Sequence, residues 1–552
     1  EHLPAMSDLP ATTSDGLARA SALGTRVTFV LDDIESVTYR SAGRVLIVGP
    51  EAEAVAAADR LGEAVDCTLL VASDGPTDRG RDAGRPVIRT GAAALEGYLG
   101  HFVLTVDDAP EPAAFDLVLD VAASPMIDRQ IAPVGYYATR GDELRLAESA
   151  AALIDMTGEF EKPRFFAYDP DICAHGRSGQ TGCTRCLDAC PTEAIISIGD
   201  QVEVNPYLCQ GAGACVAACP SGAMKYAFPA VTDLLGHIRL LLKSYRAAGG
   251  THPRVLFHDG EAGAELLEQL GPTMPEAVIP VHLEEIGATG LDTWLTCLAY
   301  GAGAVGLLVP PKTPAKVVDE LTAQIEFGRA MIAGLGIPPA ALSLVAGDAA
   351  DAPASEAYTP LDGLPETVRE EHANYTAPDE NRTIIRDTMH HLSANALNVT
   401  CLVPLPPGAP FGQELVDKDA CTLCMGCVSV CPADALQDGQ GLPQLRFVEW
   451  NCVQCGLCEG ACPEDAISLE ARFLYNPNER QQTRILNEEE PFCCVSCGKA
   501  FATGSVIESM RSKLEGHWMF QDEASRRRLE MCEDCRVADI ARAAGDPSAG
   551  PN

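Results

Sequence analysis

The sequence has little positive charge and no long apolar run. Its 552 residues include 40 Lys and Arg against 78 Asp and Glu, which gives a net charge of −38. Nucleic acids and anionic membrane surfaces are bound largely through Lys and Arg, so both are poor partners for this chain. No stretch of about 20 apolar residues predicts a membrane span. The closest stretch, 294–311, ends in glycines and prolines and favours a helix, a turn and a buried strand.

We also expect no secretory leader. Residues 1–16 have neither a charged region nor an apolar core of the signal-peptide type. The 23 cysteines therefore need another explanation than secretion and disulfides. In large chains without a leader, cysteines more often bind metal or act in catalysis. Most of them occur here in C-x2-C runs followed by proline, so we expect a cytoplasmic, metal-loaded protein.

Hydrophobic patterning predicts two small α/β domains. Apolar runs at 44–50 and 67–73 flank a helical stretch, and 101–108 and 115–123 continue the alternation, which indicates a mainly parallel sheet. Gly49 is followed by Pro-Glu-Ala-Glu rather than by the glycines of a dinucleotide loop, so we expect a structural domain without flavin.

The second α/β region covers 253–346 and ends in a long helix at about 313–334. A helix is also expected at about 141–158. Residues 347–380 are rich in Ala, Pro, Asp and Glu and poor in large apolar residues, which predicts a linker.

The clearest cysteine pattern lies between residues 418 and 470. Two runs there follow C-x2-C-x2-C-x3-C-P without a gap. In two-cluster ferredoxins, which this block resembles, the fourth thiolate of each run binds the other cluster. That crossing assigns Cys421, Cys424, Cys427 and Cys462 to cluster III, and Cys431, Cys452, Cys455 and Cys458 to cluster IV. We expect a short helix after each run, at 432–436 and 463–467.

An altered copy of the same pattern lies at 168–228. Its first run begins at Cys173, across a glycine-rich insertion, and its second run has Ala212 where the second cysteine is expected. Crossing the fourth ligands assigns Cys173, Cys183, Cys186 and Cys219 to cluster I, and Cys190, Cys209 and Cys215 to cluster II. His175, inside the insertion, is expected to be a solvated loop residue rather than a ligand.

Cluster II has three thiolates, because the alanine cannot ligate iron. This is the ligand set of a [3Fe–4S] centre, as in the seven-iron ferredoxins that the block resembles. The alternatives are a [4Fe–4S] cluster whose open corner binds solvent or Gln210, and an empty site. Ligand count favours a three-iron or site-differentiated cluster over an empty site.

A third cysteine group differs from both blocks. Cys494, Cys497, Cys532 and Cys535 form two C-x2-C pairs that resemble the knuckles of a zinc ribbon, which favours structural Zn2+ over an Fe–S cluster. Cys493 and His517 are spare candidate ligands. Three isolated cysteines are expected to be buried small hydrophobic residues: Cys67, Cys297 and Cys401.

Two resemblances concern redox complexes. Residues 276–346 ("VIPVHLEEIGATGLDTWLTCLAYGAGAVGLLVPP", then "IEFGRAMIAGLGIPPAALSLV") resemble the delta (iron–sulfur) subunit of methyl-viologen-reducing hydrogenases, which couples hydrogenase to heterodisulfide reductase. Pro310 and Pro311 stand where a cysteine is implied, so the fold and docking role are expected without a cluster. The run "FEKPRFFAYDPDICAHG…GCTRCLDACP" resembles multi-cluster ferredoxin-type proteins found with bacterial formate dehydrogenases.

The sequence therefore predicts an α/β and α+β multidomain chain of six parts. In order, these are a Rossmann-like domain (1–140), a seven-cysteine ferredoxin-like module (141–230), a Rossmann- or flavodoxin-like, hydrogenase-delta-like domain (231–346), a linker and helix (347–400), an eight-cysteine ferredoxin-like module (401–475) and a zinc-ribbon-like segment (476–552).

The leading functional hypothesis is an electron-transfer subunit with three [4Fe–4S] clusters, one three-iron or site-differentiated cluster and a structural Zn2+. It would relay single electrons between an acceptor and a redox enzyme of the formate dehydrogenase, hydrogenase or heterodisulfide reductase type. No catalytic residues or substrate site are expected. Two alternatives are an accessory or redox-sensing protein for maturation of a partner enzyme, and a flavin-containing oxidoreductase subunit.

Overall fold

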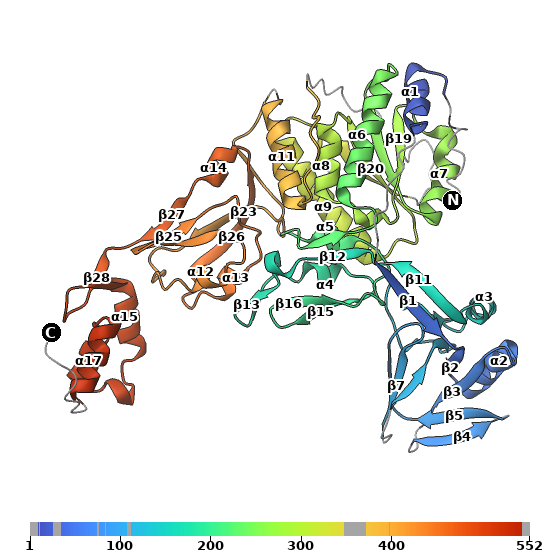
Figure 1. The fold of residues 1–552 in the computed structure, drawn as a ribbon, viewed down its shortest axis with the longest axis horizontal. Helices are drawn as coiled ribbons and strands as arrows, with labels where there is room; N and C mark the ends of the chain where they lie inside the picture. The colour runs from blue at the N-terminus through green and yellow to red at the C-terminus, as the bar shows by residue number, and fades with distance from the viewer. Residues whose placement is uncertain are drawn as a thin grey trace.

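The computed structural model describes residues 9, 11–25, 35–73, 77–82, 84–107, 112–346, 361, 371–396 and 398–543. Most of the predicted linker at 347–380 lies outside this described part. Figure 1 shows the parts of the chain side by side, with the N-terminal sheets and the C-terminal helices at opposite ends and the cysteine-rich modules between them. Within the described ranges, no helix is both long enough and apolar enough to cross a bilayer.

The N-terminal part contains a six-stranded sheet of order β10-β9-β2-β3-β5-β4, parallel except at β4. Its strands are β2 (Arg44–Val48), β3 (Asp66–Ala72), β4 (Asp78–Asp82), β5 (Arg85–Thr90), β9 (Leu117–Asp120) and β10 (Tyr136–Ala138). Helix α2 (Glu51–Leu61) covers the sheet with a buried alanine-rich face.

One strand expected in that sheet lies elsewhere. The run at 101–108 forms β7 (Phe102–Val106), which pairs antiparallel with β6 (Ala93–Glu96) and β8 (Ala113–Phe115) in a separate sheet. An apolar run predicts a strand but not its partner, because sheet membership depends on contacts distant in sequence.

The first described helix belongs to a different part of the chain than its position suggests. α1 (Ser14–Leu23) packs on α6 (Val231–Ala247), not on the N-terminal sheet. The Asp15 carboxylate accepts hydrogen bonds from Tyr245 Oη (2.7 Å) and from Thr251 N (2.6 Å). The predicted first domain, 1–140, therefore does not describe the packing of α1, which contacts the middle part of the chain. The chain leaves the N-terminal part through α3 (Glu143–Ile154) and through β11 (Gly158–Pro163), which pairs with β1 (Ser36–Ser41).

The middle part is a parallel four-stranded sheet of order β19-β18-β20-β21 covered by helices. Its elements are β18 (Arg254–His258), α7 (Glu261–Leu270), β19 (Val278–His282), α8 (Leu291–Ala299), β20 (Ala304–Val309), α9 (Ala315–Ala333) and β21 (Leu342–Ala346). The expected helix at 313–334 corresponds to α9. α8 is buried on all sides, and α11 (Asn381–Ala394), the helix after the linker, packs against it.

The first cysteine-rich module consists of short antiparallel strands and two short helices, and the second of short antiparallel strands and three short helices. The first contains β12 (Phe166–Tyr168), β13 (Gly176–Arg177), β14 (Gln180–Thr181), α4 (Arg185–Ala189), β15 (Ile195–Ile198), β16 (Gln201–Val204), α5 (Ala214–Ala218) and β17 (Met224–Tyr226). The second contains β22 (Leu402–Pro404), β23 (Gly412–Val416), α12 (Gly426–Val430), β24 (Leu436–Gly439), β25 (Leu442–Phe447), α13 (Leu457–Gly460), β26 (Ile467–Leu474), α14 (Pro477–Gln481) and β27 (Arg484–Glu488).

The helices of the second module lie before the fourth cysteines, not after them. Residues 432–436 and 463–467 form turns that enter β24 and β26. Asp434 and Asp465 adopt positive φ values of 51° and 50° there, outside the helical region. The expectation of helices at these two segments was wrong.

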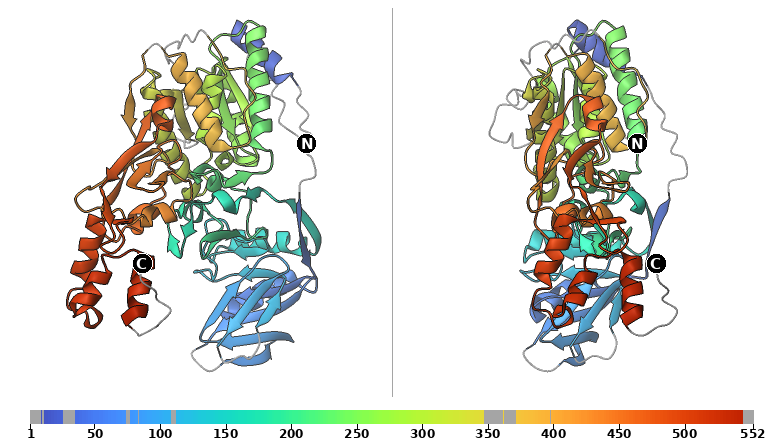
Figure 2. Two further views of the ribbon diagram at one scale, coloured as in Figure 1. Left: turned by 60° about the vertical axis from the view of Figure 1, so that its left-hand side comes forward. Right: turned by 90° about the vertical axis from the view of Figure 1, so that its left-hand side faces the viewer.

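The C-terminal segment is a hairpin followed by helices. Its elements are β28 (Pro491–Cys493), β29 (Ala500–Thr503), α15 (Gly504–Lys513), α16 (Glu523–Arg528) and α17 (Glu533–Ala543). It extends from the second module at the edge of the molecule, as Figure 2 shows from two further sides.

Candidate iron–sulfur and metal sites

The four cysteine runs repeat one local structure. In each run a short helix contains the cysteine at the third position and ends just before the fourth: α4, α5, α12 and α13. The fourth cysteine then accepts a backbone N–H hydrogen bond from four or five residues further on. The donor–sulfur distances are 3.4 Å for Ala194 to Cys190, 3.4 Å for Met224 to Cys219, 3.3 Å for Ala435 to Cys431 and 3.2 Å for Ala466 to Cys462. Such N–H groups stabilise thiolate charge and help to set the potential of a cluster.

The four cysteines of predicted cluster I lie together. Burial, then the neighbouring Cys219, Cys183 and Cys173 thiols, raise the pKa of Cys186. Burial also raises the pKa of Cys183 to about 11. These thiols would have to lose their protons to bind iron, which the positive charge of the metal promotes. The structure thus brings the predicted ligands into one site, and their binding of a cubane stays a prediction.

The three cysteines of predicted cluster II line a common cavity. Burial, and next the neighbouring Cys209 and Cys190, raise the pKa of Cys215 well above its usual value. Ala212 lines the same cavity. Gln210 lies beside it, but its Nε2 donates a 2.6 Å hydrogen bond to the Ala132 carbonyl. That hydrogen bond directs the Gln210 amide nitrogen toward the N-terminal part.

The loop around Ala212 keeps the backbone of a complete run. In the second module, the residues on each side of the second cysteine have positive φ in both runs: Leu423 (55°) and Met425 (60°), then Gln454 (55°) and Gly456 (84°). Gly211 (82°) and Gly213 (77°) flank Ala212 in the same way. Glycine adopts this conformation at little cost. Ala212 therefore occupies the place of a ligand in a loop that retains its wrapped shape.

The ligands of predicted clusters III and IV also form two groups. Burial, then Glu414, Cys424, Cys421 and Cys462, raise the pKa of Cys427 to about 12. Burial, then Glu414, Cys452 and Cys455, raise the pKa of Cys458, and Cys431 adds to the rise at Cys455. Among the four ligands of cluster III, Cys424 is exposed, which opens this site to solvent.

Sequence patterns did not indicate Glu414, a buried residue of β23. Its Oε1 lies 3.5 Å from Cys458 Sγ and 3.9 Å from Cys452 Sγ, and burial raises its pKa to about 7. Its Oε2 is buried without a hydrogen-bond partner in the described part of the chain. A carboxyl at this position would add to the negative charge of a cluster when ionised.

Buried arginines also contact the loop of predicted cluster IV, and the sequence patterns did not indicate them. Arg382 of α11 stacks on Phe411, with 4.5 Å from Cζ to the ring centre, and its Nη2 donates to the Cys452 carbonyl. Arg386, one turn along, stacks on Trp450 at 4.5 Å. Only the fold shows that one face of α11 meets the Cys452 loop. The guanidinium groups supply positive charge beside this site.

Positive charge near predicted cluster II comes in part from a partly buried lysine. Lys162 Nζ donates hydrogen bonds to the carbonyls of Tyr207 (3.2 Å) and Cys209, and it lies 5.1 Å from the ring centre of Tyr39. Burial lowers the pKa of Lys162 to about 8. One partly buried ammonium group thus stands beside a cluster II ligand.

The C-terminal cysteines form a compact four-sulfur site. The Sγ atoms of Cys494, Cys497, Cys532 and Cys535 all lie within 4.8 Å of one another, and Cys497 and Cys532 are 3.7 Å apart. A Zn–S distance of about 2.3 Å in a tetrahedron implies about 3.8 Å between sulfurs. A cubane needs wider spacing because its four irons separate the thiolates. The donor set therefore fits one tetrahedral ion.

Two expectations about single residues were wrong. His175 is buried at 2% exposure, with Nδ1 2.8 Å from the Cys183 carbonyl and Nε2 2.7 Å from Ser197 Oγ. Both ring nitrogens are engaged, so this histidine fixes the loop of Cys183. Cys401 is exposed because it lies at the edge of the second module, whereas Cys67 and Cys297 are buried as expected.

Known proteins match the two cysteine-rich modules. Residues 166–220 and 416–467 each match a family model described as a 4Fe-4S dicluster domain. Ferredoxin-1 of Caulobacter vibrioides is 45% identical over 51 residues, 9% of this chain and 43% of that protein. The formate dehydrogenase-O iron-sulfur subunit of Escherichia coli is 28% identical over 111 residues, 18% of this chain and 34% of that subunit.

A ferredoxin of Rickettsia felis is 36% identical over 75 residues, 13% of this chain and 67% of the ferredoxin. This chain thus spans less than half of the first two relatives and two thirds of the third. The chain belongs to the ferredoxin family of iron–sulfur proteins, through two 4Fe-4S dicluster domains.

Proposed function

We propose that this chain is an electron-transfer subunit that relays single electrons between a redox enzyme and an acceptor. The observation that carries this proposal is the presence of two dicluster modules whose cysteines gather in four groups. Clusters bound there supply one-electron oxidation and reduction. The residues of the chain hold the ligands, donate N–H groups to the sulfurs and place charge around each site.

The redox partner we propose is of the formate dehydrogenase, hydrogenase or heterodisulfide reductase type. The relationship to the formate dehydrogenase-O iron-sulfur subunit supports a partner that oxidises formate. The resemblance of 276–346 to a hydrogenase delta subunit supports a docking role for the middle part. Pro310 and Pro311 end β20 in a turn and offer no thiolate, which agrees with a domain that has no cluster of its own.

For cluster II we propose a three-iron or site-differentiated cluster. The retained loop geometry around Ala212 supports a bound cluster over an empty site, because Gly211 and Gly213 keep the left-handed conformation that flanks a ligand in the complete runs. For the C-terminal site we propose structural Zn2+. The sulfur spacing supports a single tetrahedral ion.

Reduction of the purified chain by a partner enzyme tests the proposed relay. Anaerobic protein is mixed with catalytic amounts of a formate dehydrogenase and formate, and bleaching of the Fe–S absorption is followed. We expect bleaching that depends on both enzyme and substrate. Full reduction by dithionite without any reduction by formate dehydrogenase or hydrogenase with their substrates would contradict the proposed class of partner.

A further inference from the structure

The two ferredoxin-type modules are in contact where the loop of cluster I meets the loop of cluster IV. Gly182 directly precedes the cluster I ligand Cys183. A Cβ added at Gly182 would lie 2.6 Å from Leu457 Cγ and 3.1 Å from the carbonyl oxygen of Cys455, a cluster IV ligand. α13 also packs against β14. The absence of a side chain at residue 182 thus lets two ligand loops from different modules approach closely.

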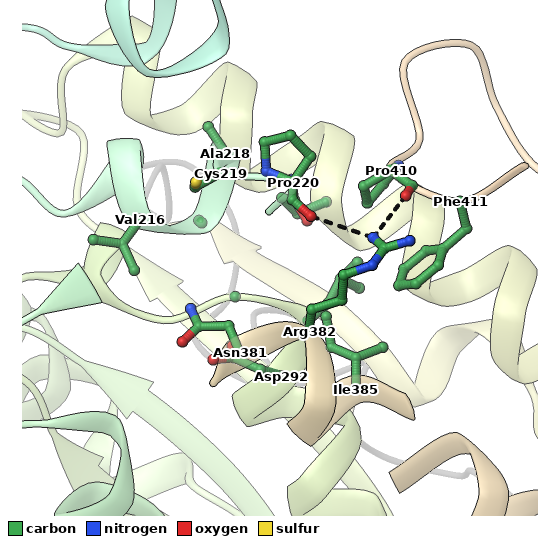
Figure 3. A pocket seen from close by; sticks show the side chains of 14 residues that line it. Val216, Ala218, Cys219, Pro220, Asp292, Asn381, Arg382, Ile385, Pro410 and Phe411 are labelled. Carbon is green, nitrogen blue, oxygen red and sulfur yellow. Dashed lines mark hydrogen bonds between the residues drawn. The ribbon is translucent and has the colours of Figure 1, made fainter. Parts of the chain in front are cut away.

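Two arginines connect the same two loops. Arg177, in the insertion of the first module, donates a 3.1 Å hydrogen bond from Nη1 to the carbonyl of Cys431, a cluster IV ligand. Arg382 Nη1 donates to the carbonyls of Pro220 (3.2 Å) and Pro410 (2.9 Å), and its Nη2 donates to the Cys452 carbonyl. Figure 3 shows Arg382 reaching from α11 to Pro220, which directly follows the cluster I ligand Cys219.

The other two clusters lie at the far ends of the modules. Cluster II is next to the N-terminal and middle parts, where Lys316 Nζ donates a 3.1 Å hydrogen bond to the Cys190 carbonyl. Cluster III is next to the C-terminal segment, where Thr503 Oγ1 and Ser505 Oγ donate to the Thr422 carbonyl at 3.0 and 3.2 Å. Neither cluster II nor cluster III lies at the contact around Gly182.

We propose that electrons move through the chain in the order II–I–IV–III, in either direction, and that the Gly182 contact is the step between modules. This inference rests on the proposed relay function. With clusters held by these cysteines, one electron would leave one member of the pair and enter the other, so that one would be oxidised and one reduced. The partner enzyme and the acceptor supply and remove the electron at the ends. Arg177 and Arg382 are positioning residues that hold the two loops at tunnelling distance.

The order predicts which clusters interact magnetically in the reduced protein. Neighbouring paramagnetic clusters broaden each other's electron paramagnetic resonance signals, and the interaction falls steeply with distance. The Cys455→Ala variant removes a ligand of cluster IV. In the full-length, dithionite-reduced variant we expect the signal of cluster I to lose the broadening that cluster IV causes. Cys424→Ala, at cluster III, should leave that broadening in place.

Two milder variants test the contact itself. In Gly182→Ala the added Cβ meets Leu457 and the Cys455 carbonyl, so the loops must separate and the I–IV broadening should decrease. Gly460→Ala is the matched control at the same interface, because its Cβ would lie 3.7 Å from Gln180 Oε1, an ordinary contact. Arg177→Ala, at an exposed side chain, should weaken the broadening without loss of iron.

The proposed order would be overturned if Cys424→Ala, and not Cys455→Ala, narrowed the cluster I signal. Unchanged broadening in both Gly182→Ala and Arg177→Ala, at full iron content, would overturn the role of the contact. Both outcomes leave the relay function intact, because that function is tested by reduction through a partner enzyme.

Discussion

The two ferredoxin-type modules share a backbone but differ in ligands and in surrounding charge. The second has all eight cysteines of its two runs, whereas the first has seven and a ligand position occupied by Ala212. The second is flanked by buried guanidinium groups, including Arg382 and Arg386, whereas predicted cluster II of the first lies beside the ammonium groups of Lys162 and Lys316. The comparison shows that one loop geometry can be kept while a ligand position and the electrostatic surroundings change.

These differences give the two modules different expected potentials. Cluster potentials depend on cluster type, net charge and hydrogen bonds to sulfur. Three-iron centres generally lie at higher potential than cubanes, and nearby positive charge also raises the potential because it stabilises the reduced, more negative cluster. We therefore expect a high potential at cluster II because of its three-cysteine ligand set. We expect a raised potential at cluster IV because of the positive charge beside it.

Removal of one thiolate from each module should have the largest effect. Cys458→Ala should lose about four irons per chain and Cys215→Ala about three, because the first residue serves a cubane and the second a three-iron centre. Iron analysis of anaerobically purified variants measures both. Equal losses of about four irons would show that the modules do not differ in cluster type.

Restoring the missing ligand should make the first module resemble the second. In Ala212→Cys we expect about one additional iron per chain and loss of the oxidised three-iron signal, because the new thiolate completes a four-cysteine set. Ala214→Cys, two residues away in α5, is the matched control and should change neither quantity. Gain of the same iron in both variants would contradict a specific open corner at residue 212.

Removal of one positive charge at a time should change the potential of one cluster without changing that of the other. Lys162→Met should lower the potential of cluster II, and Arg386→Met that of cluster IV, each leaving the other cluster nearly unchanged. The loss of about 1–2 kcal/mol of Coulomb stabilisation corresponds to tens of millivolts for one electron. Redox titration followed by electron paramagnetic resonance measures each shift. Shifts at both clusters from either variant would show that these charges do not act locally.

Zinc removal should have the smallest effect on the clusters. A chelator, or Cys535→Ser, should release about one Zn2+ per chain and loosen the C-terminal segment, while the Fe–S spectra of both modules stay close to those of the intact protein. Metal analysis and hydrogen exchange measure these two results. Iron rather than zinc at this site, or loss of cluster signals with the metal, would contradict a separate structural role.

Each ligand group could be predicted from the sequence because cysteine spacing constrains it locally, and the binding of a cluster by each group stays a prediction. The residues of each predicted cluster lie together in the fold, and the parallel sheets follow apolar runs such as 44–50 and 67–73. Contacts between segments that are distant in the sequence could not be predicted, because they leave no local pattern in it. Glu414 is one polar residue in a strand, and Arg382 is a helix arginine that only the packing of α11 brings to Cys452.

Burial of single residues was equally hard to predict. His175 lies in a polar, glycine-rich insertion, where a solvated side chain is the ordinary expectation. Its two hydrogen bonds depend on how that insertion folds back onto Ser197 and the Cys183 carbonyl. The packing of α1 on α6, far from its neighbours in sequence, depends likewise on Tyr245 and Thr251.

Metal analysis combined with electron paramagnetic resonance of the oxidised, anaerobically purified chain tests the central claim most directly. We predict about fifteen irons and one zinc per chain, from three cubanes, one three-iron centre and one tetrathiolate site, with a three-iron signal in the oxidised state. About twelve irons with no oxidised signal would contradict it, since cluster II would then be absent and the first module would hold a single cluster.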